Sequence, residues 1–286
     1  MNGPETTTRS VAAVTRRLLL AYCALGFFAG VPLFIGTGET DRYFAWTIMP
    51  SLTAAFLGAG YWASCVLNLL AARKRAWAGA RIAVPAGLVF TTVMLVATLL
   101  HLDRFHFGGP LSVAQSVAWI WLVVYVAIPP LTLIVFLRQT RAPGRDEFRG
   151  PPLPRAVRFV LACQGVVMTG VGTALLLAPE ATASIWPWTL TELTGRAAAA
   201  WLAGVGVLAM QISWENDISR ASVAFVPYTL LAGLQFVALA RYPSTVDWSG
   251  ASAWIYLLFL GSMFAAGAYA WSSGRRASTS SKVFGR

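Results

Sequence analysis

The sequence predicts an all-α integral membrane protein with eight transmembrane helices, arranged as two parallel four-helix repeats. Of its 286 residues, 57% are hydrophobic and only 12% are charged, whereas a soluble domain averages about 25% charged residues. The charges are clustered, and the charge-free stretches run to about 20 residues, the length that crosses ~30 Å of hydrocarbon as a helix. Short segments also recur in the same order in the two halves.

Eight stretches have this length and composition. They are Leu18–Ile35, Pro50–Leu70, Ile82–Leu100, Ser116–Leu137, Phe159–Leu177, Ala197–Ser213, Ala221–Ala240 and Ser252–Trp271. Inside lipid the backbone must satisfy its own hydrogen bonds, so spans of this length are expected to be helices. The first span follows two arginines, as in a signal peptide, but it is longer than a cleavable apolar core and seven more follow. We therefore expect it to remain as the first helix.

The net charge of +11 is distributed unevenly along the chain. With the N-terminus inside, 18 of the 22 basic residues fall in inner segments, and the outer segments keep only Arg42, Arg104, Arg196 and Arg241. This is the positive-inside pattern, which predicts both termini in the cytoplasm and the chain in the plasma (inner) membrane. Inner basic segments attract anionic lipid, so the charge does not indicate a nucleic-acid partner.

Four short matches connect the two halves of the chain. The matched pairs are Ala118–Leu122 with Ala253–Leu257, Arg104-Phe105 with Arg241-Tyr242, Trp46-Thr47 with Trp188-Thr189, and Val84-Pro85 with Val226-Pro227. They occur in the same order, at offsets between 135 and 142 residues. Each half has four spans, an even number, so both halves enter the membrane in the same direction. Parallel repeats related by an axis along the membrane normal are therefore expected.

This internal duplication predicts the boundaries of the parts. Residues 1–139 form the first repeat and residues 159–272 the second. Between them, residues 140–158 form a cytoplasmic linker rich in Pro, Gly and Arg, residues typical of an irregular connection. The Ser- and Arg-rich tail, 273–286, is expected to be disordered.

None of the eight predicted spans contains Asp, Glu, Lys, Arg or His. Charged residues inside the membrane mark proton relays and ion pathways, so their absence from these spans argues against a coupled transporter with midplane carboxylates. It also argues against a haem, which needs an axial ligand inside the bundle. The polar residues Asn68, Gln164, Gln211 and Gln235 are expected to form interhelical hydrogen bonds. Tryptophans near the span ends are expected to form aromatic belts.

The outer loops hold the charged groups that a ligand could contact. The candidates are Glu39, Asp41 and Arg42 after the first span, Asp103 and Arg104 after the third, and Arg241 after the seventh. Arg104 and Arg241 occupy matching positions in the two halves, and an aromatic residue follows each. Arginine forks bind phosphate or carboxylate through two hydrogen bonds. These residues favour an anionic small molecule or a lipid headgroup as the ligand.

The loop after the third span also holds the only two histidines of the chain, His101 and His106. With Asp103 they offer imidazole and carboxylate, the ligands of zinc and related ions. Three interpretations stay open: an amphipathic helix end at the interface, a metal site, and an anion or headgroup site around Arg104. Apart from a metal in these outer loops, the sequence indicates no cofactor.

These features favour a non-enzymatic binding, transport or accessory subunit with a polar site toward the outer face, between the repeats. The alternative is a membrane-embedded enzyme that acts at the outer leaflet through His101, Asp103 and His106. A structural role beside a membrane-protein partner is a third hypothesis. The Tyr43–Ile48 segment and the Ala/Gly/Arg-rich composition resemble multi-pass proteins of high-GC bacteria, and this resemblance implies no activity.

Overall fold

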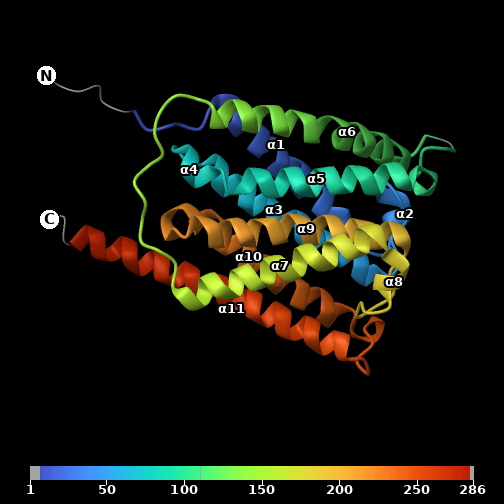
Figure 1. Ribbon diagram of the computed structural model, residues 1–286. Coiled ribbons are helices and arrows are strands. Elements are labelled where there is room, and N and C mark those ends of the chain that lie inside the picture. Colours follow the sequence, from blue (N-terminus) through green and yellow to red (C-terminus); the bar gives the residue numbers. More distant parts are fainter. Residues whose placement is uncertain (1–6, 110, 284–286) are drawn as a thin grey trace, which may run out of the picture.

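The computed structural model describes residues 7–109 and 111–283, with side chains as far as Ser272. The long helices (Figure 1) are α1 (Ala13–Gly30), α3 (Ser51–Ala72), α5 (Ala83–Leu100), α6 (Val113–Thr140), α7 (Arg155–Leu177), α9 (Glu192–Glu215), α10 (Ile218–Arg241) and α11 (Ala251–Val283). Among the described residues these eight helices are long and apolar enough to cross a membrane, with α1 extended by the π-helical turn η1 (Val31–Ile35). The prediction of an all-α, multi-pass membrane protein with eight spans is confirmed.

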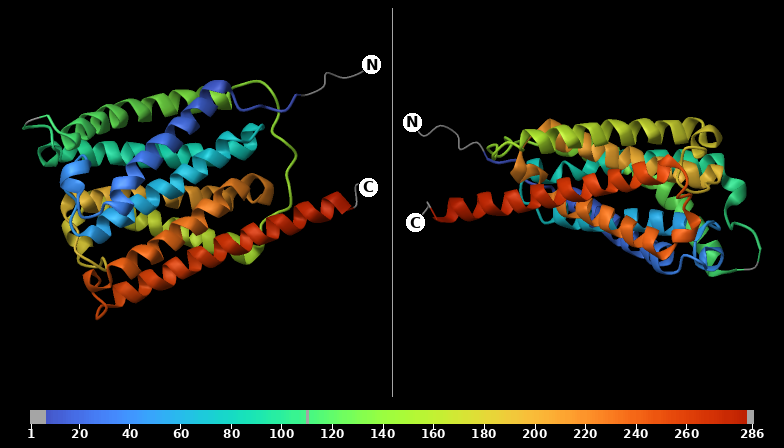
Figure 2. Two further views of the ribbon diagram at one scale, coloured as in Figure 1. Left: turned by 180° about the vertical axis from the view of Figure 1, so that it is seen from behind. Right: turned by 90° about the horizontal axis from the view of Figure 1, so that it is seen from below.

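Short elements distinguish the two ends of the bundle. The helix α4 (Trp77–Ala80), the irregular segment 141–154 and the last turns of α11 lie at one end, here called the linker end (Figures 1 and 2). The opposite, distal end carries α2 (Thr40–Tyr43), α8 (Pro179–Ala183) and the 3-10 turns η2 (Leu102–Arg104) and η3 (Pro243–Thr245). The described chain starts and finishes at the linker end, as an even number of spans requires. Which side of the membrane this end faces stays a prediction.

The segment between α6 and α7 is irregular over residues 141–154, and it is hydrogen-bonded to the turn between α9 and α10. The Gly150 N–H donates to Asp217 Oδ2 at 2.8 Å, and the Ile218 N–H donates to the Pro151 carbonyl at 2.9 Å. At the C-terminal end, α11 continues to Val283 and extends past the other helices (Figure 2), and the disorder expected of the tail stays a prediction. Residues 273–283 contain no proline that would end the helix. Residues 284–286 of the predicted tail lie outside the described part of the chain.

Helices α3 and α9 form the centre of the bundle. In their apolar windows 67% of the residues are buried, against 28% for α6 and α11. Helix α3 packs against α1 and α10, and α9 packs against α7 and α5. The two halves therefore interleave, because α5 of the first half lies on α9 and α10 of the second half lies on α3. The contacts of α3 with α1 and α10 match those of α9 with α7 and α5, as a two-fold axis along the helices would require. The duplication itself stays a prediction.

Glycine permits close helix approach at two contacts. A Cβ atom at Gly165 in α7 would lie 2.9 Å from the Gly206 carbonyl oxygen of α9. A Cβ atom at Gly60 in α3 would lie 2.6 Å from the ring of Trp201 in α9. Small residues allow helix backbones to approach in this way. The second contact brings α3 and α9 together at the centre of the molecule.

Charged residues join the two halves at the linker end. Arg81, which precedes α5, donates to the two carboxylate oxygens of Glu215 at 2.6 and 2.8 Å and to Asp146 at 2.5 Å. Arg220, in the first turn of α10, donates to Glu215 at 3.2 Å. One cluster therefore joins Arg81 of the first half, Glu215 and Arg220 of the second half, and Asp146 of the segment between them.

Candidate functional site

A cavity of about 680 Å³ lies between α7 and α11, toward the distal end. The two helices are joined where Gln164 donates to Ser262 at 2.7 Å, and from there they diverge toward the distal end (Figure 1). On α11 the lining runs from Ala251 to Met263, which is roughly 18 Å of helix at 1.5 Å per residue. This is about half of the ~30 Å hydrocarbon thickness of a bilayer. The cavity therefore has the depth of one leaflet.

The lining is largely apolar, and the cavity opens to the side. Val167 and Val171 of α7, Leu202 of α9, and Ile255 and Phe259 of α11 all contribute to the lining. Val167 is 50% exposed and Ile255 is 64% exposed. Both belong to membrane-spanning segments, and an exposed apolar side chain in such a segment contacts acyl chains. The opening of the cavity therefore faces lipid.

Polar groups gather at the distal end of this cavity, where Ser184, Trp186, Asp247 and Ser252 line it. The indole Nε1 of Trp186 is buried and has no hydrogen-bond partner among the described residues. Asp247 accepts hydrogen bonds from the hydroxyl and the backbone N–H of Ser249, and these bonds lower the pKa of the Asp247 carboxyl. This carboxylate is therefore ionised at neutral pH.

A hydrogen-bonded chain crosses the cavity wall at greater depth. The Tyr256 hydroxyl of α11 donates to Gln235 Oε1 of α10 at 3.3 Å, and Gln235 Nε2 donates to the Phe56 carbonyl of α3 at 3.1 Å. The interhelical hydrogen bond expected for Gln235 is therefore present, and it connects the two halves. Tyr256 and Gln235 both line the cavity, so they place polar atoms deeper in it than the polar groups at the distal end.

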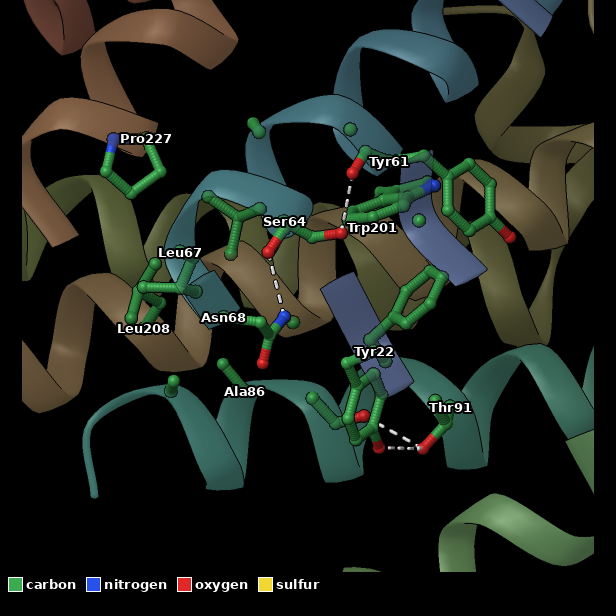
Figure 3. Close-up of a pocket in the computed structure, with 18 of the residues that line it drawn as sticks. Tyr22, Tyr61, Ser64, Leu67, Asn68, Ala86, Thr91, Trp201, Leu208 and Pro227 are labelled. Atoms are coloured by element: carbon green, nitrogen blue, oxygen red, sulfur yellow. Dashed lines mark hydrogen bonds between the residues drawn. The ribbon is translucent and has the colours of Figure 1, made fainter. Parts of the chain in front are cut away.

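A second cavity of about 90 Å³ lies at the centre of the molecule, lined by residues from both halves (Figure 3). The hydroxyls of Tyr61 in α3 and Tyr125 in α6 are hydrogen-bonded to each other at 2.6 Å. Asn68 of α3 donates to the Ser64 carbonyl at 2.8 Å (Figure 3). These polar side chains are thus bonded within the protein. The rest of the lining is mainly apolar.

The two arginines at matching sequence positions lie in different surroundings. Arg104 is exposed and pairs with Asp103 at 3.1 Å. The Arg241 guanidinium donates to the Phe34 carbonyl of η1 and lies over the rings of Phe34 and Tyr242, at 5.5 and 5.2 Å from their centroids. Arg241 thus caps the end of the first span. Neither arginine lines either of the two cavities.

The other predicted ligand-binding residues lie at α2. Glu39 is the N-cap of this short helix, and Asp41 and Arg42 lie within it, with exposed side chains at the distal end. They also line neither cavity. An anion site formed by these residues with Asp103, Arg104 or Arg241 stays a prediction.

The structure separates the environments of the two histidines. Arg196 Nη1 donates to His101 Nε2 at 2.6 Å, whereas His106 contacts the Phe44 carbonyl at 3.0 Å and the Thr47 hydroxyl at 3.1 Å. Burial, with the nearby Arg196 charge, lowers the pKa of His101. Over the described chain, no three His, Cys, Asp or Glu side chains are placed to hold a metal ion together. The metal site of His101, His106 and Asp103 stays a prediction.

The sequence alone does not identify the residues that line the two cavities as a site. In the sequence, Gln235 is one of several polar residues inside spans, and Trp186 is one of several tryptophans near span ends. Trp201 lies in the middle of α9, and its position in the sequence does not indicate a binding site, because one aromatic residue in an apolar helix is usual. Their common location depends on the packing of α3, α9, α10 and α11.

Comparison of the chain with protein-family models, with curated proteins and with solved structures finds no match.

Proposed function

We propose that this protein is a non-enzymatic lipid-binding protein of the bacterial plasma membrane, with the distal end outside. One acyl chain of a membrane lipid would lie in the cavity between α7 and α11, with the headgroup at the distal end. The observation that carries this proposal is a cavity of about 680 Å³, within the ~300–1,000 Å³ range of ligand sites, that opens through exposed apolar side chains. The outside assignment rests on the positive-inside pattern.

The depth and polarity of the cavity fit a lipid of the outer leaflet. An acyl chain gains little by leaving other lipid chains for the protein, because lipid tails and leucine side chains are equally apolar. Selectivity therefore has to come from packing and from polar contacts. The unpartnered Trp186 N–H, the Ser252 hydroxyl and the ionised Asp247 at the distal end of the cavity supply such contacts.

The charge at this end favours a particular kind of headgroup. A carboxylate accepts hydrogen bonds and repels a bare phosphate nearby. Asp247 therefore favours a headgroup that donates hydrogen bonds, through hydroxyl or ammonium groups. An anionic ligand of Arg104 or Arg241 would have to bind elsewhere on the distal surface.

The enzyme alternative has less support from the geometry. His101 is the acceptor for Arg196, and both ring nitrogens of His106 contact protein oxygens. Neither imidazole lines one of the two cavities, so a substrate there would not reach them. We therefore prefer binding over catalysis as the role of this protein.

The test compares two valine-to-tryptophan variants of the same helix. Val171 lines the cavity, whereas Val166 is exposed on α7 and does not line it. Each protein is purified in mild detergent, and the retained lipid per mole of protein is measured by mass spectrometry. Val171→Trp should fill the cavity and lower the amount of retained lipid about ten-fold or more, the effect of a steric mismatch in a tight apolar site.

Val166→Trp should keep the wild-type amount of lipid, since its side chain points to the bulk membrane. Equal lipid contents in all three proteins would contradict the proposal. An equal loss in both variants would do the same, because annular lipid rather than a specific site would then explain the retained lipid. The melting temperature of each variant is measured in parallel to establish that the fold is intact.

A further inference from the structure

We infer that the Trp201 side chain limits the length of the acyl chain that the cavity between α7 and α11 admits. This inference rests on the proposed lipid-binding function and adds a determinant of chain-length selectivity. Its basis is the position of the Trp201 indole between the two cavities. A longer chain could continue into the central cavity only if this ring were absent or displaced.

Trp201 is part of the wall that the two cavities share. Its side chain lines both, together with Gly60, Val205 and Leu231. On one side lie Phe56 and Gln235 of the lipid-facing cavity, and on the other lie the residues of the central cavity labelled in Figure 3. Along α9 the lipid-facing cavity is lined from Trp201 to Val205, and the central cavity is lined from Trp201 to Leu208. The ring therefore stands in the wall that an acyl chain from the lipid-facing cavity would have to cross to enter the central cavity.

Packing holds the indole in this position. Its ring centroid lies 4.1 Å from that of Phe90, at an interplanar angle of 34°, and 5.0 Å from that of Tyr61, at 86°. Gly60 provides the room, since a Cβ atom there would lie 2.6 Å from the ring. The indole Nε1 is buried and has no hydrogen-bond partner in the described part of the chain. Replacing Trp201 therefore breaks no described hydrogen bond of this indole.

The central cavity can accept the end of an apolar chain. Its volume of about 90 Å³ is several times the ~10–15 Å³ of cavity volume needed to hold one water molecule. The hydroxyls of Tyr61 and Tyr125 bond to each other, so a chain end beside them leaves neither without a partner. Removal of the indole would join this volume to the space vacated by the ring. The other walls stay in place, because the Tyr61–Tyr125 and Tyr22–Thr132 hydrogen bonds do not involve Trp201.

The experiment measures retention of a homologous series of lysophosphatidylethanolamines, whose ammonium headgroup donates hydrogen bonds and which differ only in acyl-chain length. Each is added to delipidated protein in detergent, and bound lipid is quantified by native mass spectrometry. Wild-type protein should bind chains up to a limiting length and discriminate against longer ones. Trp201→Ala should raise the limit by roughly two methylenes or more, and the first lengths that wild type rejects should bind about ten-fold better.

Trp201→Phe keeps an aromatic ring at the packing position and should give a smaller shift in the same direction, so it decides the question if Trp201→Ala does not fold. Trp62→Ala is the matched control. Trp62 is a half-buried tryptophan of α3 whose Nε1 also lacks a described partner, and it lines neither cavity. The limiting acyl-chain length of Trp62→Ala should equal that of wild type.

An unchanged limit in both Trp201 variants, with wild type binding lipid, would overturn the inference while leaving the proposed function intact. The same shift in Trp62→Ala as in Trp201→Ala would also overturn it, because general loosening would then explain the result. Absence of bound lysophospholipid in wild type at every length would reject the proposed function and this inference together.

Discussion

Trp46 lies edge-on against Trp121, with 5.0 Å between the ring centroids and 78° between the ring planes. Trp188 and Tyr256 make the same kind of contact, at 5.6 Å and 71°. Trp188 follows Trp46 by 142 residues and Tyr256 follows Trp121 by 135, the offsets at which the sequence repeats. A long-range contact that recurs at these offsets supports our proposal that the chain arose by duplication.

Thr53→Val should destabilise the protein by removing a hydrogen bond between the halves. Trp188 Nε1 donates to Thr53 Oγ1 at 3.0 Å, and both side chains are buried. Valine has nearly the same shape as threonine, so the main effect is an unpaired N–H, which costs about 1–3 kcal/mol. Thermal unfolding in detergent measures the loss. Thr173→Val is the control, because the Thr173 hydroxyl is exposed and donates to the Thr169 carbonyl of its own helix. Equal losses in the two variants would contradict the prediction.

Glu215→Gln should weaken the cluster that joins the halves at the linker end. Two arginines, Arg81 and Arg220, donate to this largely buried carboxylate. Neutralising it removes one of the two negative charges that both arginines face, the other being Asp146. Because Arg81 is partly exposed, we expect a loss of about 2–4 kcal/mol, below the ~3–5 kcal/mol for breaking a fully buried pair. The measurement is the midpoint of thermal unfolding, with Asp103→Asn as the control.

Asp103 also pairs with an arginine, but both side chains are largely exposed. Exposed pairs contribute little to stability, so Asp103→Asn should leave the unfolding midpoint unchanged. A comparable fall in both variants would show that the cluster at Glu215 has no special role.

The sequence was sufficient to predict the helices but not which faces they bury. Trp119 and Trp254 are 52% and 57% exposed, as the predicted aromatic belts require, whereas Trp46 and Trp188 are 2% and 4% exposed. The belt prediction is wrong for the last two, which pack inside the protein. A helix that is apolar on all sides carries no amphipathic signal for its buried face. Distance from the span end was the only available criterion, and it does not distinguish the two cases.

The candidate site was less predictable for a related reason. The cavity arises because α7 and α11 diverge beyond the Gln164–Ser262 contact, and no local pattern encodes the angle between two helices 90 residues apart. Charged residues in loops are the usual sequence signal of a ligand site. A lipid-facing cavity needs no charged residue, so its lining gives no such signal. Arg104 and Arg241 hold matching positions in the sequence, but their side chains have different partners, because Arg241 donates to the Phe34 carbonyl and Arg104 pairs with Asp103.

Acid should destabilise the protein through His101. In the folded state Arg196 donates to His101 Nε2, so that nitrogen carries no proton, and burial with the Arg196 charge lowers the pKa of His101. In the unfolded chain the His pKa is about 6.5. At pH values between the folded and the unfolded pKa of His101, the unfolded chain therefore binds more protons than the folded protein. Stability is therefore fully present above pH ~6.5, falls as the pH drops below that value, and levels off below the folded pKa.

Thermal unfolding followed from about pH 8 to pH 5, the range in which His titrates, measures this dependence. His101→Gln should remove the part of the pH dependence that comes from His101, since glutamine does not titrate. Arg196→Ala should reduce it, because the donor and the repelling charge are both lost while burial persists. A wild-type profile identical to that of His101→Gln would show that His101 does not contribute.

Cysteine labelling from outside tests the orientation on which the lipid-binding proposal depends. In a background with the three native cysteines replaced, Ser244→Cys lies in η3 at the distal end and Phe148→Cys lies in the exposed segment between α6 and α7. Placement of 18 of the 22 basic residues on the linker side predicts that this side is cytoplasmic. A membrane-impermeant maleimide applied to intact cells should therefore modify the cysteine at 244 and not the one at 148. Detergent lysis should make both reactive, which controls for accessibility. The opposite pattern in intact cells would place the cavity opening in the inner leaflet and reverse the proposed source of the lipid.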